Sequence, residues 1–353
     1  MKQRIEYLDS LKAVSILLVV FCHYVLMPNE TVLGNMIMAL SWCAVPCFMM
    51  VSGGLMHRSN RFEWKKYLKK IAKLYIILVL WRGIYLLVHI FVANVELNTP
   101  ETIQYLFFFS DIKGVNTGVM WYMNAFLLVQ LFYPVTHYLF CSGETRGRQI
   151  LIFLLILFAI SGIAVPSFNW ISNTLSKNPI NFTDIYNIMP FTKYANMLFY
   201  FVLGAFLLEY RGKINNRIGH YRYIFPLLIV IGTVCLIMIK RIDSGSYAWN
   251  GIYIIKGYNR VATALLSLGM YLTFASFNFG KIYRYFSWIG RYTMGIYYIH
   301  YILLFVCSVY LYPLIQDHYF FGINSLKTLI ITAVCVVLTR GIQRIPYINE
   351  LVK

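Results

Sequence analysis

The amino-acid sequence predicts an all-α protein, a polytopic membrane helix bundle of about ten transmembrane helices. Of its 353 residues, 59% are hydrophobic and only 12% are charged, whereas a soluble domain is nearer half apolar and a quarter charged. A helix needs about 20 mostly apolar residues to cross a bilayer, and the apolar runs here are continuous rather than alternating, which argues against a closed barrel. Ten such runs occur, at about 11–28, 34–56, 74–94, 118–140, 150–167, 194–210, 223–240, 260–279, 292–314 and 325–341.

The distribution of Lys and Arg orients these helices. If the N-terminus is inside, the segments on the inner side hold 22 of the 31 Lys and Arg residues. Because cytoplasmic segments carry the excess of basic residues, we expect both the N- and the C-terminus in the cytoplasm. No repeat, low-complexity stretch or linker divides the chain, so we expect one transmembrane domain over 1–353. The inner segments are 1–12, 57–73, 141–149, 211–222, 280–291 and 340–353.

The net charge of +18 does not indicate a nucleic-acid-binding protein, because the basic residues lie between apolar runs, where they set orientation. A basic inner edge suits anionic membrane lipids or an anionic soluble substrate such as a nucleotide-like cofactor. The cysteines fall mostly inside apolar runs, and no pair has zinc-ligand spacing near histidines, so we expect neither disulfides nor a metal site. They are Cys22, Cys43, Cys47, Cys141, Cys235, Cys307 and Cys335.

The apolar stretch from Ala13 to Met27 carries one ionisable side chain, His23, and Lys12 precedes His23 by eleven residues. That separation is about three helical turns, which places both side chains on one face, roughly 16 Å apart along the axis. An imidazole in hydrocarbon is costly and by default indicates function. The alternative is a histidine buried between helices and hydrogen-bonded to a neighbour.

The segment 57–73 is the densest in positive charge. If it is helical from Phe62 onward, its lysines form one basic stripe at three- and four-residue spacing. Such a stripe at the membrane edge can bind phosphates as point charges, although it can equally be a topology anchor that contacts lipid phosphates. The stripe consists of Lys66, Lys69, Lys70 and Lys73.

Two more ionisable side chains lie inside predicted spans. Arg82 is well within the third run, where neither lipid nor deprotonation accommodates a guanidinium, so it must face a partner or a water-filled cavity. His300 lies near mid-membrane in the ninth run. It either joins His23 across the bundle or is a packing histidine with satisfied hydrogen bonds.

Several of these residues belong to short motifs that follow one another in a fixed order. The motifs are Leu8-Asp9-Ser10-Leu11-Lys12 with His23, Pro46-Cys47-Phe48 with Ser52-Gly53, Lys70-Ile71-Ala72-Lys73, Trp121-Tyr122-Met123 with Pro134, Phe201-Val202-Leu203-Gly204, and Ile289-Gly290 with Gly295-Ile296-Tyr297-Tyr298-Ile299-His300. Together they resemble the acyltransferase type 3 family, integral membrane proteins that acylate, usually acetylate, sugar hydroxyls of bacterial surface glycans. The resemblance runs nearly end to end.

The resemblance implies a multi-pass protein of the cell inner (cytoplasmic) membrane that moves an acyl group from cytoplasmic acyl-CoA, most simply acetyl-CoA, to a carbohydrate or lipid-linked glycan hydroxyl. His23 then acts as general base or carries a transient acyl group. Basic groups at the inner edge hold the coenzyme A phosphates, namely Lys12, Lys69, Lys70 and Lys73.

Other residues receive secondary roles in this interpretation. Arg82 and His300 are candidates for steadying the oxyanion or the acceptor, and Asp9, Ser52 and Trp121 support the site. The family has arginine at the positions of Lys70 and Lys73, so bidentate phosphate contacts become point charges here.

Two alternatives stay open. Basic inner edges and intramembrane Arg and His also describe a transporter or lipid-linked-glycan exporter, which does not require Lys12 and His23 on one helix. The second alternative is a structural scaffold for a glycan-synthesis complex. It is favoured only if lysine in place of arginine at positions 70 and 73 has abolished binding of the donor. The sequence does not specify the acceptor, the acyl group or the oligomeric state, and it is compatible with a homo-oligomer.

Overall fold

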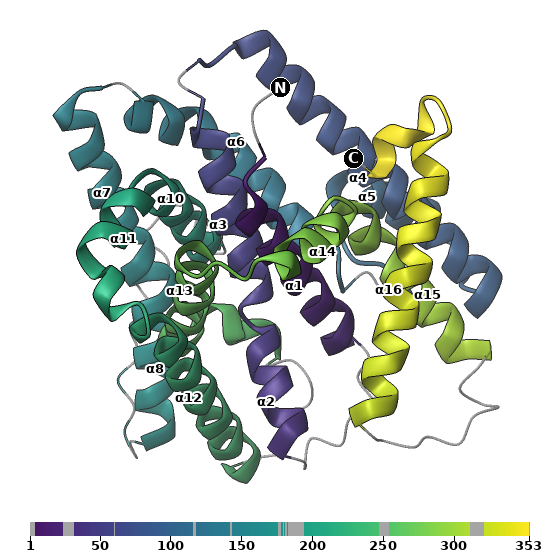
Figure 1. Cartoon of the computed structure of the whole chain (residues 1–353). Helices are drawn as coiled ribbons and strands as arrows, with labels where there is room; N and C mark the ends of the chain where they lie inside the picture. The colour runs from purple at the N-terminus through teal and green to yellow at the C-terminus, as the bar shows by residue number, and fades with distance from the viewer. Residues whose placement is uncertain are drawn as a thin grey trace.

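The computed structural model describes residues 4–23, 32–59, 61–115, 118–141, 143–175, 178, 180, 182, 194–246, 254–310 and 321–352. These residues form helices joined by turns, with no β-strand among them. The helices pack into a bundle (Figure 1). The predicted all-α class is confirmed.

Each of the ten predicted runs coincides with one or more helices. The ends of two runs, at 24–28 and 311–314, lie outside the described residues. The helices are α1 (Glu6–His23), α2 (Val32–Ser41), α3 (Ala44–His57), α4 (Trp64–Ala93), α6 (Trp121–Cys141), α7 (Thr145–Ala159), α8 (Val165–Leu175), α10 (Ala195–Glu209), α12 (Ile224–Ser246), α13 (Val261–Ser276), α15 (Thr293–Tyr310) and α16 (Phe321–Gln343).

Within the described ranges, five helical stretches are long and apolar enough to cross a membrane. Three shorter apolar helices, α10, α13 and the first part of α12, accompany them. Together they describe a multi-pass membrane protein, while ten crossings and the orientation remain predictions. The five stretches are Met36–His57, Trp64–Ala93, Thr145–Asn173, Thr293–Tyr310 and Ser325–Gln343.

The second predicted run is not one continuous helix. The N–H groups of Trp42 and Cys43 each bond a carbonyl three residues earlier at 3.2 Å, which forms a tight turn between α2 and α3. Pro46 lies in the first turn of α3, where its missing N–H removes no intrahelical bond. The fifth run is similarly interrupted by a π-helical turn at Ile160–Ala164.

Helix α4 begins at Trp64, ten residues before the predicted span at 74–94, because the basic stripe is itself helical. The condition set for the stripe, a helix from Phe62 onward, is met from Trp64. Additional helices occupy segments expected as connections. They are α5 (Thr99–Phe108), α11 (Arg211–Ile218), α14 (Lys281–Gly290) and the 3-10 helix η6 (Ile348–Val352).

Helix α1 lies inside the bundle and packs against α3, α14 and α15. Its first turns fit closely against α14, since a Cβ added at Gly290 would lie 2.1 Å from the Asp9 carbonyl oxygen. The Ser10 hydroxyl donates to the Tyr283 carbonyl at 3.1 Å. Burial raises the pKa of the Tyr283 phenol, which stays protonated and donates to the Phe274 carbonyl at 2.6 Å. Contacts with α14 therefore fix the position of the first turns of α1.

Helices α3 and α10 approach until their backbones touch. A Cβ added at Gly53 would lie 1.8 Å from the Phe201 carbonyl oxygen, and one added at Gly204 would lie 2.0 Å from that of Met50. Small residues at crossing points allow this approach between membrane helices. Two motifs of the sequence, Ser52-Gly53 and the one ending at Gly204, thus have a packing explanation.

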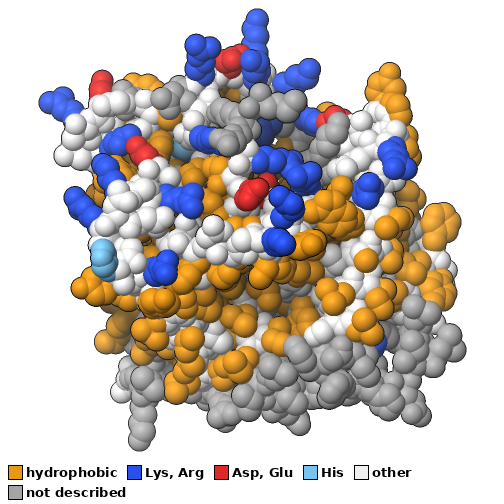
Figure 2. Space-filling model, in the orientation of Figure 1, with side chains coloured by type: hydrophobic (Ala, Val, Ile, Leu, Met, Phe, Trp, Pro, Cys, Tyr) orange, Lys and Arg blue, Asp and Glu red, His pale blue; other side chains and the backbone are white. Residues whose placement is uncertain are grey.

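The surface separates charge from apolar area. On the face shown in Figure 2, Lys and Arg side chains gather in the upper part, above a broad hydrophobic belt. The start of α1 and the C-terminal segment lie toward that same end of the bundle (Figure 1). Exposed apolar side chains continue along α4, where Phe91 is 78% exposed. This arrangement suits a bilayer around the belt and basic groups at one membrane edge.

Candidate functional site

His23 and His300 meet inside the bundle. His23 is the last residue of α1 and His300 lies in the middle of α15. Their ring centroids are 5.5 Å apart with the planes tilted by 40°, and Tyr301 meets the His23 ring edge-on at 5.5 Å. His300 is fully buried. The structure therefore brings together the two histidines that the sequence left in separate helices.

The imidazole of His300 is paired on one side only. Its Nδ1 lies 2.9 Å from the Ile296 carbonyl oxygen. Because a carbonyl can only accept, Nδ1 carries the proton and Nε2 presents a lone pair. Nε2 is buried and has no hydrogen-bond partner among the described residues. Leaving such an atom unpaired costs about 1–3 kcal/mol, so Nε2 is a position where a ligand hydroxyl or a water molecule would be favoured.

Aromatic side chains hold α15 around this position. Tyr297 lies 6.2 Å from His300, centroid to centroid. The Tyr297 hydroxyl donates to the carbonyl of Val119, just before α6. From α4, the Tyr85 hydroxyl donates to the Tyr298 carbonyl at 3.0 Å, and Trp81 stacks on Tyr298 at 4.8 Å. Contacts from α4 and α6 thus fix the backbone that carries His300.

Arg82 contacts α5 and the segment that follows it. Its Nε donates to the Tyr105 carbonyl at 2.6 Å, an Nη2 hydrogen goes to the Ser110 carbonyl, and the guanidinium lies 4.1 Å from the Tyr105 ring centroid. The side chain is 1% exposed. These contacts supply the partner that a buried guanidinium requires, and they join α5 to α4.

Lys12 forms an ion pair with Asp9, with Nζ 2.6 Å from Oδ1. The two are one helical turn apart on α1, and Asp9 is itself buried against α14. Asp9 restrains the lysine at the start of the face that ends in His23.

The remaining predicted phosphate-binding lysines lie on α4 and have different partners. Lys70 Nζ is 3.5 Å from Gln130 Oε1 on α6, and Lys73 pairs with Glu350 in the C-terminal segment. Lys69 is exposed. The stripe thus faces both α6 and the chain end.

The predicted supporting residues occupy helix contacts. Ser52 is half-buried next to Gly53, at the crossing of α3 and α10. Trp121 begins α6 and packs on Tyr258 at 5.0 Å, while Trp42 packs on the same tyrosine at 4.9 Å. Trp121 therefore helps to join α6 to the turn between α2 and α3.

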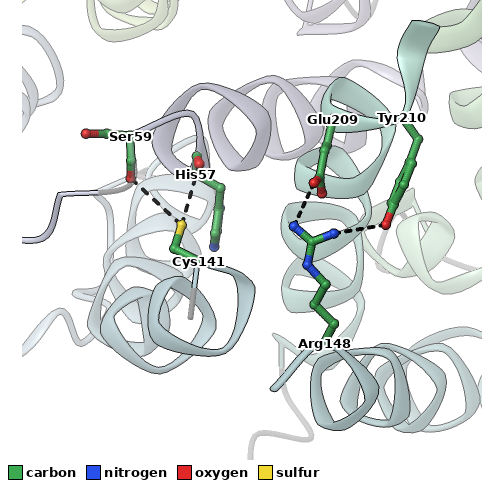
Figure 3. A network of polar contacts seen from close by, with 6 residues as sticks. All are labelled: His57, Ser59, Cys141, Arg148, Glu209 and Tyr210. Carbon is green, nitrogen blue, oxygen red and sulfur yellow. Dashed lines mark hydrogen bonds and ion pairs between the residues drawn. The ribbon is translucent and has the colours of Figure 1, made fainter. Parts of the chain in front are cut away.

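A second polar group lies where α3, α6, α7 and α10 meet (Figure 3). Arg148 donates to Glu209 Oε1 at 2.8 Å and to the Tyr210 hydroxyl at 3.2 Å. Cys141 Sγ lies 3.9 Å from the carbonyl oxygens of His57 and Ser59. Four of them, His57, Cys141, Arg148 and Glu209, border a cavity of about 470 Å³. The predicted phosphate-binding lysines do not line it.

Sequence reasoning singled out neither Arg148 nor Glu209, because each lies beside a basic connection where it resembles an ordinary loop charge. His57 likewise flanks a span, yet it is 3% exposed and its two nitrogens bond Gly53 O at 2.8 Å and Thr136 Oγ1 at 3.0 Å. No sequence signal distinguished these groups from topology residues.

In the described part of the chain, no group of three or more His, Cys, Asp and Glu side chains could hold a metal ion. A family model described as an acyltransferase domain matches residues 5–340. No curated protein and no solved structure matches the chain significantly.

Proposed function

Because the chain belongs to the acyltransferase type 3 family of membrane acyltransferases, we propose that it is an O-acyltransferase acting on a carbohydrate. The donor is a cytoplasmic acyl-CoA, most simply acetyl-CoA. The acceptor is a hydroxyl of a cell-surface or lipid-linked glycan, and the protein works in the cytoplasmic membrane.

The observation that carries this proposal is the unpaired Nε2 of His300 beside the ring of His23. Two imidazoles with centroids 5.5 Å apart, one with a buried lone pair and no partner among the described residues, suit the removal of a proton from an alcohol. A general base contributes about 10²- to 10⁴-fold to such a reaction.

In the proposed reaction, His23 is the base. As the acceptor oxygen attacks the thioester carbonyl, His23 takes the hydroxyl proton and a tetrahedral oxyanion forms. Collapse breaks the carbon–sulfur bond, and the coenzyme A thiolate leaves and recovers the proton from His23. His300 Nε2 orients the acceptor by accepting a hydrogen bond from a neighbouring hydroxyl of the same sugar, which leaves the proton of the attacking hydroxyl to His23.

The lysines support binding of the donor. Lys12, Lys70 and Lys73 are placed at the basic edge predicted to be cytoplasmic, with Lys69 beside them on α4. An ammonium group binds a phosphate as a point charge. Arg82 acts at a distance, by holding α5 to the helix that contacts α15 through Trp81 and Tyr85.

The experiment compares the mass of surface glycans, and their total amount, in cells with and without this protein. The proposal expects glycans of unchanged amount that lose a discrete acyl mass, 42 Da for acetyl. Loss of the glycans themselves, with the acyl groups of the remainder intact, would instead identify an exporter and contradict the acyltransferase proposal.

A further inference from the structure

The C-terminal segment returns to the basic stripe of α4. After α16 the chain reverses at Tyr347, whose φ of 66° is in the left-handed region, and η6 follows at Ile348–Val352. Within η6, Glu350 forms an ion pair with Lys73 across 277 residues of sequence. A carboxylate of the chain thereby contacts a lysine of the proposed phosphate site.

This segment is held in place beside Lys73. The Trp81 Nε1–H donates to the Leu351 carbonyl at 2.9 Å, and Val352 is 1% exposed. η6 packs against α4, α15 and α16. Because these contacts hold the backbone around Glu350, its carboxylate is kept close to Lys73.

The ion pair itself is suited to exchange. Both side chains are close to half exposed, at 47% for Lys73 and 41% for Glu350, and exposed ion pairs are weak because water and salt screen them. A phosphate monoester carries about −1.5 to −2 charge at neutral pH, against −1 for a carboxylate. A donor phosphate therefore competes effectively for the same ammonium.

We propose that Glu350 is an intramolecular competitor of the donor phosphate at Lys73 and thereby determines the affinity and specificity of the donor site. The inference rests on the proposed function, because it takes the donor to be an acyl-CoA. A donor that carries a phosphate monoester displaces the carboxylate, whereas one that lacks it leaves the Glu350–Lys73 pair in place.

The test is the dissociation constant of acetyl-CoA, measured calorimetrically on the full-length protein in detergent. Glu350→Gln removes the competing charge and keeps the shape, so it is expected to lower the dissociation constant about two- to five-fold, the range of a weak exposed pair. Trp81→Phe keeps the stacking on Tyr298 but loses the N–H bond to Leu351, and is expected to act in the same direction.

Glu63→Gln is the matched control. Glu63 makes an exposed pair with Lys66 at 2.8 Å, just before α4, so the substitution removes the same charge close to the same stripe. It is expected to leave the dissociation constant within about 1.5-fold of the unmodified protein. With 3′-dephospho-acetyl-CoA, which lacks the phosphate monoester, Glu350→Gln is expected to give no gain.

The outcomes are distinct. An unchanged acetyl-CoA affinity in Glu350→Gln, or an equal gain in Glu63→Gln, would overturn the competition by Glu350 while leaving the acyl-CoA donor intact. If neither the unmodified protein nor any variant binds acetyl-CoA, the donor assigned in the proposed function is contradicted, and this inference with it.

Discussion

His300 and His57 differ in how completely their ring nitrogens are hydrogen-bonded. In both, Nδ1 bonds the carbonyl one turn earlier, at 2.9 Å and 2.8 Å. The Nε2 of His57 then meets the Thr136 hydroxyl, whereas that of His300 has no partner among the described residues. His57 thus joins α3 to α6, and His300 retains a buried acceptor without a partner among the described residues.

Arg82→Met is expected to destabilise the protein. The change keeps much of the side-chain volume but leaves the carbonyls of Tyr105 and Ser110 without their charged donor. Each hydrogen bond to a charged group contributes about 1.5–3 kcal/mol, so the free energy of unfolding should fall by about 2–4 kcal/mol. Thermal unfolding in detergent measures this, and an unchanged midpoint would show that Arg82 is not needed to hold α5.

Replacing both Lys70 and Lys73 by alanine is expected to raise the Michaelis constant for acyl-CoA about ten-fold, as for a loss of about 1.4 kcal/mol of charge pairing. The constant for the acceptor should change little. Arg61→Ala with Lys65→Ala removes equal charge nearby, at exposed positions outside the stripe, and is the control. An equal rise in both double variants would point to general electrostatic attraction instead of a phosphate site.

At the scale of the helix, the contact between α3 and α10 tolerates no added methyl group. Gly204→Ala places a Cβ 2.0 Å from the Met50 carbonyl oxygen, which forces the helices apart, and overpacking of this kind typically costs about 1–3 kcal/mol. Gly212→Ala is the control, since nothing lies within 4 Å of its Cβ position and alanine favours a helix by up to about 1 kcal/mol. Equal unfolding midpoints for the two variants would contradict the close crossing.

The apolar runs predicted the helices that coincide with them, because a membrane helix satisfies its own backbone and needs only a continuous apolar stretch. They did not predict the break at Trp42 and Cys43, since both residues are compatible with an apolar helix. α14 was also missed. Lys281 and Arg284 interrupt its apolar residues, so the segment is not a continuous apolar run and was not predicted to be a helix.

At the scale of the molecule, the candidate site depended on contacts between distant segments. The phase of Lys12 and His23 along α1 is a local property, and the sequence expresses it. The meeting of His23 with His300 was one of two alternatives, because helical phase does not specify which helices are neighbours. The Glu350–Lys73 pair and the carbonyl partners of Arg82 left no sequence signal, since backbone carbonyls and surface carboxylates occur everywhere.

The predicted topology has a direct consequence for labelling. With both termini cytoplasmic, a cysteine placed at exposed Lys65 faces the cytoplasm and one placed at exposed Glu101 in α5 faces outward. A membrane-impermeant maleimide added to intact cells should label Glu101→Cys and not Lys65→Cys, with the unmodified protein as background. The reverse pattern would invert the orientation and place the lysine stripe away from cytoplasmic acyl-CoA.

His23 is proposed to be the base for acyl transfer. Its most direct test is the incorporation of label from acetyl-labelled acetyl-CoA into the glycan fraction of membranes that contain equal amounts of folded protein. His23→Ala is expected to lower the rate about 10²- to 10⁴-fold, whereas His220→Ala, at an exposed position, should retain it. Incorporation at the unmodified rate by His23→Ala would show that His23 is not the base.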